Sequence, residues 1–285
     1  MKIVTLTLAN DEICICSRCQ KDGRSRSYTH MINAIRETWA AEEVEGVKNF
    51  FIYGHRKGID FPENSKIINS KERYWPNGGA GDGVLPVDVE TKRKAFAIDD
   101  CIYSDTPEGR ENLYYKTVDG FEWLVENEDF DYLIRPSAGS YIDLLLFKKF
   151  LEGIGIRDNV YAGSIGTYNN KHNATQPPSI KFASGAGFIA SRNLIESLVM
   201  RRNIIDPVRS PYASATISDD VTFAKHFSYD LGVPIIQFPK HQFTSVAQVD
   251  ERVKDHMHCY FTHTINPDLM YAVHAAKGLT RKVIY

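Results

Sequence analysis

The sequence predicts an α/β fold in which strands and helices alternate along the chain. An apolar run over Lys2–Leu8 is typical of a buried strand, a helical pattern covers Tyr28–Ala40, and a second strand pattern covers Val47–Tyr53 before Gly54. Such alternation is the signature of a sheet whose strands are joined by crossover helices. With 285 residues, 43% of them hydrophobic, the chain can bury one large core or two closely packed halves.

The middle of the chain repeats the pattern and predicts where a ligand would bind. A helix is expected over Leu113–Glu126, a strand over Phe130–Ile134, and a further helix over Leu144–Leu151. Between the last two lies Arg135–Tyr141, which proline and glycine break. Because α/β proteins bind ligands at the carboxyl ends of their strands, this break is a candidate site.

Composition excludes some partners. The formal net charge is -2 and the basic residues are dispersed, so no nucleic-acid or anionic-membrane footprint is visible. The apolar start is too short for a signal peptide, and no segment is apolar over the length of a bilayer. We therefore expect a cytoplasmic protein, bacterial or from a virus-infected host cell.

Cys14, Cys16 and Cys19 crowd into one segment with the spacing C-x-C-x-x-C. Together with His30 they could hold zinc, but the paired C-x-x-C arrangement and a clear fourth ligand are missing. Reduced cytosolic thiols on a polar loop are the favoured interpretation.

Glycines dominate Pro76–Gly83, which predicts a mobile loop without regular structure. Its spacing matches neither of the two common phosphate-binding glycine patterns, G-x-x-x-x-G-K-[ST] and G-x-G-x-x-G.

The adjacent acids Asp219 and Asp220 follow the turn Ser184-Gly185-Ala186-Gly187 by about thirty residues. Side chains next to each other on a helix point to different faces, so one acid can face a cleft while its neighbour caps the helix or meets solvent. An ordinary helix start before Val221 explains the same residues.

Several motifs occur in the order seen in the Fringe and beta-1,3-galactosyltransferase-like glycosyltransferases, which this chain therefore resembles over most of its length. They are Ile35-Arg36-Glu37-Thr38-Trp39, Glu111-Asn112-Leu113-Tyr114-Tyr115-Lys116-Thr117 with Trp123, the strand to Tyr141, Phe182-Ala183-Ser184-Gly185-Ala186-Gly187-Phe188, and Asp219-Asp220-Val221.

The resemblance implies a GT-A-like fold: a Rossmann-like nucleotide-sugar-binding sheet with helices on both faces, fused to an acceptor-binding half. We expect one domain over 1–285, with the nucleotide-sugar half at about 1–145 and the acceptor-binding and catalytic half at about 146–285. It also implies inverting sugar transfer, with Asp220 as general base and Asp219 as its neighbour. A carboxylate in reach of an acceptor hydroxyl can take its proton during attack on the anomeric carbon.

One departure from the family affects the metal site. The family's D-x-D cation ligands fall where this chain has Pro136-Ser137-Ala138-Gly139, none of which is a carboxylate. We therefore expect no cofactor, although Mn or Mg held by acids from elsewhere, such as Asp143 or Asp99, stays open. Arg135–Tyr141 also looks like an R-x-N-x-S-S-F turn of uncharacterised bacterial and viral relatives.

Without a cation, the diphosphate needs other partners. The donor-binding candidates are Arg135, Ser137, Ser140, Lys116, Arg36 and His258, and the acceptor-binding candidates are Ser184, Gly185, Ala186 and Gly187. Arg135 could instead be a surface or interface salt-bridge residue.

Two other groups invite alternative interpretations. Asp99-Asp100 resembles the missing metal motif, but we expect a solvated turn there. In the tail His256-Met257-His258 to His263, a strand would place His256 and His258 on one face, and a partly buried histidine without a ligand is as good an interpretation of His258 as a diphosphate contact.

The sequence is thus interpreted as an inverting glycosyltransferase that uses a nucleotide-sugar donor and a glycan acceptor and needs no metal. The alternative is a non-catalytic carbohydrate- or nucleotide-binding module on the same scaffold, against which the retained acidic pair argues. A phosphate-handling hydrolase would need a metal cluster or an activated nucleophile, and neither is visible.

Overall fold

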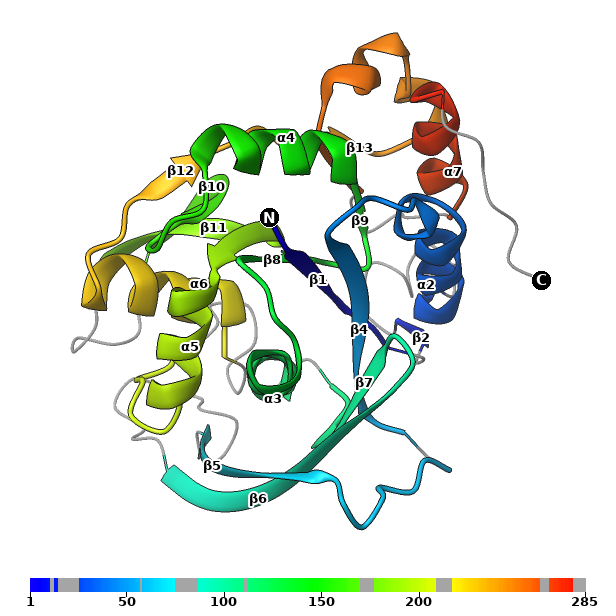
Figure 1. Cartoon of the computed structure of the whole chain (residues 1–285). Coiled ribbons are helices and arrows are strands. Elements are labelled where there is room, and N and C mark those ends of the chain that lie inside the picture. Colours follow the sequence, from blue (N-terminus) through cyan, green and yellow to red (C-terminus); the bar gives the residue numbers. More distant parts are fainter. Residues whose placement is uncertain are drawn as a thin grey trace.

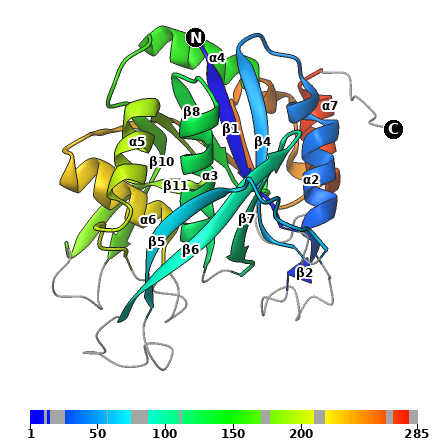
Figure 2. The same ribbon diagram turned by 60° about the horizontal axis from the view of Figure 1, so that its bottom comes forward.

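The computed structural model describes most of the chain (Figures 1 and 2). The described residues are 1–10, 13–14, 26–56, 58–74, 87–109, 112–169, 177–208, 217–261 and 267–278. The glycine-rich segment, Cys16, Cys19, Glu111 and His263 lie outside these ranges.

A nine-stranded mixed sheet forms the centre of the molecule. From one edge to the other its strands are β12 (Ile235–Gln237), β10 (Tyr161–Asn169), β11 (Ser179–Ser191), β8 (Tyr132–Pro136), β1 (Ile3–Leu8), β4 (Val47–His55), β7 (Cys101–Pro107), β6 (Val87–Ile98) and β5 (Lys66–Tyr74). β8, β1, β4 and β7 run parallel, whereas β11 pairs antiparallel to β8. The four parallel strands therefore end at one edge, beside Ser184–Gly187 of β11. The turn predicted at Ser184–Gly187 is wrong: these residues lie inside β11, where its register with β10 shifts, and are called the β11 bulge below.

Helices cover both faces of this sheet (Figure 1). On one face lie α2 (Tyr28–Glu37), α4 (Leu144–Ile154) and α7 (Pro267–Ala276); on the other lie α3 (Leu113–Asn127), α5 (Arg192–Arg201) and α6 (Asp219–Ala224). Successive side chains of β4 point to opposite faces of the sheet, so β4 contributes to both hydrophobic cores. Phe51 packs in the core on the α2 face and Ile52 in the core on the α3 face. This mixed α/β architecture confirms the predicted fold class and is consistent with a GT-A-like fold.

Short elements complete the described structure. A small sheet joins β13 (His241–Phe243), β14 (His258–Phe261) and β9 (Ser140–Ile142), and β2 (Ile13–Cys14) pairs with β3 (Arg26–Ser27). The single-turn and π-helical segments are η1 (Trp39–Ala41), η4 (Lys225–Asp230), η5 (Val246–Gln248) and η6 (Glu251–Asp255). No helix in the described ranges combines the length and apolar character that crossing a bilayer requires.

The predicted elements are confirmed with small shifts at their ends. The strand expected over Phe130–Ile134 runs over Tyr132–Pro136, because Arg135 and Pro136 still pair with Phe188 and Gly187 of β11. The break that follows is short, since β9 begins at Ser140. The sequence reading missed the long antiparallel pair β5 and β6, whose mostly polar residues lack an apolar alternation.

The β5 edge of the sheet is covered by side chains. The Asn203 side chain accepts a hydrogen bond from Lys71 N at 2.8 Å and donates to Asn69 O at 3.4 Å. The Tyr115 hydroxyl accepts from Arg73 N at 2.5 Å and lies 3.1 Å from Arg73 O. These contacts occupy backbone groups that an edge strand would otherwise leave open.

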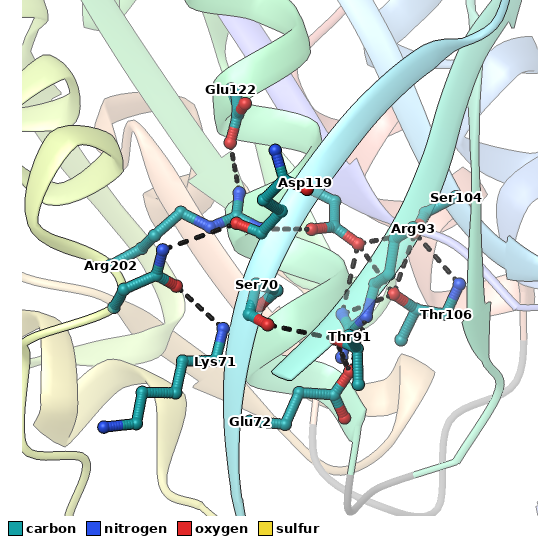
Figure 3. Close-up of polar contacts among 12 residues, drawn as sticks. Ser70, Lys71, Glu72, Thr91, Arg93, Ser104, Thr106, Asp119, Glu122 and Arg202 are labelled. Carbon is teal, nitrogen blue, oxygen red and sulfur yellow. Dashed lines mark hydrogen bonds and ion pairs between the residues drawn. The ribbon is translucent and has the colours of Figure 1, made fainter. Parts of the chain in front are cut away.

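A buried polar network fastens α3 to the β6–β7 hairpin (Figure 3). One carboxylate oxygen of Asp119 accepts from Ser104 Oγ at 2.6 Å, from Thr106 Oγ1 at 2.7 Å and from Arg93 Nη1 at 3.2 Å. The other lies 3.4 Å from Arg202 Nη2. Because these charges are paired and hydrogen-bonded, burying them here is tolerated.

Candidate active site

The predicted catalytic and turn residues converge where β8 ends. β11 lies antiparallel to β8, so Gly187 sits opposite Pro136, and α6 packs over β11 on the α3 face. Ser137 N donates to Ala186 O at 3.1 Å, which joins the end of β8 to the β11 bulge. Residues far apart in sequence therefore meet at the carboxyl end of a central parallel strand, as expected for an α/β ligand site.

Arg135 is a fully buried cation with an internal partner. Its Nη2 forms an ion pair with Asp219 Oδ2, and its Nη1 donates to Gly185 O at 2.7 Å. The side chains of Arg135 and Asp219 are only 2% and 11% exposed. Arg135 thus holds the acidic helix start against the β11 bulge. It does form a salt bridge, but a buried one and not the surface or interface salt bridge that the sequence left open.

Asp220 contacts the same β11 bulge. Its Oδ2 accepts from Gly185 N at 2.8 Å, and its Oδ1 accepts from Val221 N at 2.9 Å and from Ser218 Oγ at 3.1 Å. Burial, followed by the neighbouring charge of Asp219, raises the pKa of Asp220 to about 6, against the lowering effect of the Gly185 hydrogen bond and Arg135. A carboxylate with a pKa near neutrality is suited to general-base chemistry.

Gly185 has a local reason to be glycine. A Cβ built at this position would lie 2.9 Å from Asp220 Oδ2 and 3.3 Å from Arg135 Nη1. The backbone can therefore approach both charged side chains only because this residue has no side chain.

Ser137 and Ser140 close the turn after β8. Their hydroxyl oxygens lie 3.1 Å apart, Gly139 N donates to Ser137 Oγ at 3.2 Å, and Ser140 Oγ donates to Ala186 O. Ser137 and Ser140, which were predicted to bind the nucleotide-sugar donor, therefore lie beside the acidic pair. Ser140 is fully buried. Whether they contact a donor stays a prediction.

His258 packs against Gly187 in the β11 bulge. A Cβ at Gly187 would come within 2.9 Å of His258 Cε1 and Nε2. The ring is fully buried between Phe147 and Phe238, and neither nitrogen makes a hydrogen bond of normal geometry to a described residue, although the Ala186 backbone lies near enough to raise the pKa slightly. Burial and the charge of Lys240 dominate and lower the pKa of His258 to about 3, so the ring is neutral at pH 7.

The expected pairing of His256 with His258 on one strand face is wrong. β14 begins only at His258, and His256 packs its ring against His241 instead, with 4.5 Å between ring centroids.

Lys116 and Arg36 do not join this cluster. Lys116 Nζ is bound by Ala9 O at 2.8 Å and Glu108 Oε2 at 2.7 Å. The Arg36 guanidinium pairs with Asp100 Oδ1 at 2.7 Å and covers the Phe51 ring on the α2 face, whereas Arg135 stacks near Phe188 on the opposite face. Their charges are met within the protein, and their donor-binding role stays a prediction.

The other acids that could hold a cation lie apart from one another. Asp99 and Asp100 form the turn of the β6–β7 hairpin, as predicted, with Asp99 at φ 53°. Asp143 caps α4 by accepting from Leu146 N at 3.0 Å and pairs with Lys277 Nζ at 2.8 Å. Within the described ranges no three His, Cys, Asp or Glu side chains gather as a metal site would need. Dependence on a metal stays untested.

Lys240, which lies between β12 and β13, is a site residue that was not predicted from the sequence. Its Nζ donates to Ser184 Oγ at 3.0 Å and lies 4.9 Å from the centroid of the Tyr260 ring. Burial lowers the pKa of Lys240, and the negative charge of Asp220 opposes this effect only in part. A lone lysine in a loop carries no sequence signal; only the β13–β14 pairing brings it here.

Fold and site define an α/β protein with an acidic, glycine-lined site at the end of its central parallel strand. No family model matches the chain, and no curated protein matches it in sequence. Among solved structures it is similar to a glycosyltransferase involved in the glycosylation of the major capsid of PBCV-1, with a TM-score of 0.40 and 9% identity over 98% of this chain and 100% of that chain. A likeness this distant carries no functional inference.

Proposed function

We propose that this chain is an inverting glycosyltransferase that moves a sugar from a nucleotide-sugar donor to a hydroxyl of a glycan acceptor. The observation that carries the proposal is Asp220, a partly buried carboxylate with a pKa of about 6 that is held by Gly185 N–H at the carboxyl end of β8. The motif order of the Fringe-like enzymes, noted in the sequence, supports the same role.

In this reaction Asp220 takes the proton of the acceptor hydroxyl as its oxygen attacks the anomeric carbon. The bond from that carbon to the donor phosphate oxygen breaks, and the nucleoside diphosphate leaves with the electron pair. One displacement inverts the configuration, and no covalent enzyme intermediate forms. Arg135 and Asp219 act through position, because their ion pair fixes the helix start that carries Asp220.

The test is a panel of nucleotide sugars offered with and without glycan acceptors, with release of nucleoside diphosphate as the readout. Wild type should release the diphosphate from at least one donor, and Asp220→Asn should reduce that rate by about a hundredfold to ten-thousandfold. Asp255→Asn, which removes an exposed carboxylate elsewhere, is the matched control.

Binding without turnover would instead favour the alternative, a carbohydrate- or nucleotide-binding module. Equal turnover by wild type and Asp220→Asn would remove Asp220 from the mechanism. A product with retained anomeric configuration would exclude single displacement.

A further inference from the structure

The basic side chains that were expected to contact an anionic ligand are either paired with a carboxylate or neutral. Arg135 is paired with Asp219, and Lys116 is paired with Glu108. His258 is neutral at pH 7 because burial lowers its pKa to about 3. A ligand that brings two or more negative charges therefore needs another partner at this site.

Lys240 differs from these residues in its surroundings. Its ammonium is half-buried, yet no carboxylate oxygen within the described parts of the chain lies within the 4.0 Å of an ion pair. Burial lowers the pKa of Lys240 more than the charge of Asp220 raises it, and the Asp220 oxygens accept hydrogen bonds from Gly185 N, Val221 N and Ser218 Oγ.

The hydrogen-bonding capacity of Lys240 is only partly used. An ammonium has three donors, of which one reaches Ser184 Oγ, while the Tyr260 ring lies against the charge. Two donors remain, next to the Ser184 hydroxyl on β11. Positively charged donors at a partly dehydrated position favour phosphate oxygens.

We propose that Lys240, together with the Ser184 hydroxyl, binds the phosphate group of the donor. This inference rests on the proposed function. As the bond between anomeric carbon and phosphate oxygen breaks, the electron pair stays on that oxygen, and the Lys240 ammonium stabilises the charge without giving up its proton. Ser184, expected from the sequence to contact the acceptor, thereby faces the donor phosphate instead.

Inorganic pyrophosphate tests this role without any sugar chemistry. Isothermal titration calorimetry at low salt should give a measurable Kd for wild type and a Kd about tenfold to hundredfold weaker for Lys240→Gln, the loss expected for one charge-assisted contact. Lys240→Arg should retain most of the affinity. Lys149→Gln, which removes an exposed lysine on α4, is the control for loss of net charge.

The outcomes separate this inference from the proposed function. Pyrophosphate binding that depends on Lys240, in a protein that transfers no sugar, supports the phosphate site and overturns the transferase. Sugar transfer with equal pyrophosphate affinity in wild type and Lys240→Gln overturns the phosphate role and leaves the transferase standing. Failure of wild type to bind pyrophosphate also overturns the phosphate role.

Discussion

Arg135 on β8 and Asp219 on α6 form a buried ion pair that ties the central sheet to the acidic helix start. Removing one partner leaves the other charge buried and uncompensated, which typically costs ~3–5 kcal/mol. We therefore expect Arg135→Met and Asp219→Asn each to lower the free energy of unfolding by about this amount, measured by urea denaturation.

The double variant Arg135→Met/Asp219→Asn is the control for this pair. Its loss should be clearly smaller than the sum of the two single losses, because neither charge is then stranded. Strict additivity would mean that the two side chains stabilise the fold independently. That result would also favour the earlier interpretation of Arg135 as a direct contact to the nucleotide-sugar donor.

The activity should depend on pH through Asp220. A general base works as the carboxylate, so kcat/KM should rise with pH and level off above about 6, where the group titrates. Initial rates between pH 4.5 and 8.5 check this. A profile that is flat across pH 6 would place the essential base elsewhere.

The contribution of Asp220 to folding stability should fall as pH rises, whereas its contribution to activity should rise. The pKa of Asp220 is about 6 in the fold and 3.8 without it, so between these values the folded state binds more protons than the unfolded state. The Asp220 contribution to the free energy of unfolding therefore falls as pH rises from about 4 to about 6 and stays low above that.

Asp220→Asn removes this penalty, so its melting temperature should exceed that of wild type at pH 8 by more than at pH 4. Thermal melts of both proteins at the two pH values measure the difference. Because His258 titrates in both proteins, its own contribution cancels. A variant equally destabilised at both pH values would contradict a raised pKa.

Gly187 should not accept even a methyl group. An alanine Cβ would lie 2.9 Å from the His258 ring, and overpacking of a filled site typically costs ~1–3 kcal/mol. Gly187→Ala should lower the free energy of unfolding by this amount. Adding His258→Ala should make the Gly187→Ala step nearly neutral; an unchanged cost would show that the clash lies with the backbone.

Transfer should persist in EDTA. The turn Pro136–Gly139 offers hydroxyl and backbone groups where the Fringe-like enzymes have carboxylates, so a divalent ion would find no such ligand there. Rates with EDTA and with added manganese decide the point. Loss on chelation and recovery with manganese would direct attention to Asp99 and Asp100.

The sequence predicted β1, β4, β8, α2, α3 and α4, because these buried strands and amphipathic helices carry a strong apolar pattern. It did not predict the remaining strands of the central sheet or the helices α5 and α7. β5 and β6 could not be predicted, since one of their faces is polar and the charges of Arg93 and Glu72 are paired only in three dimensions. In the site, Asp219, Asp220 and Ser184–Gly187 were found by their motifs, although Ser184–Gly187 lies in a strand and not in the predicted turn. Which acid meets Arg135, and the presence of Lys240, depend on contacts between segments far apart in the chain.

The side chains that bond to the outer edge of β5 affect whether two molecules of this protein can associate through that edge. Asn203 and Tyr115 satisfy the outer backbone groups around Asn69, Lys71 and Arg73, so a second molecule cannot add its own strand there without displacing them. Replacing Asn203 with leucine would expose that ladder beside the already exposed Ile67 and Ile204. The Asn203 side chain thus blocks strand addition at β5, and its loss would allow sheets of neighbouring molecules to join into aggregates.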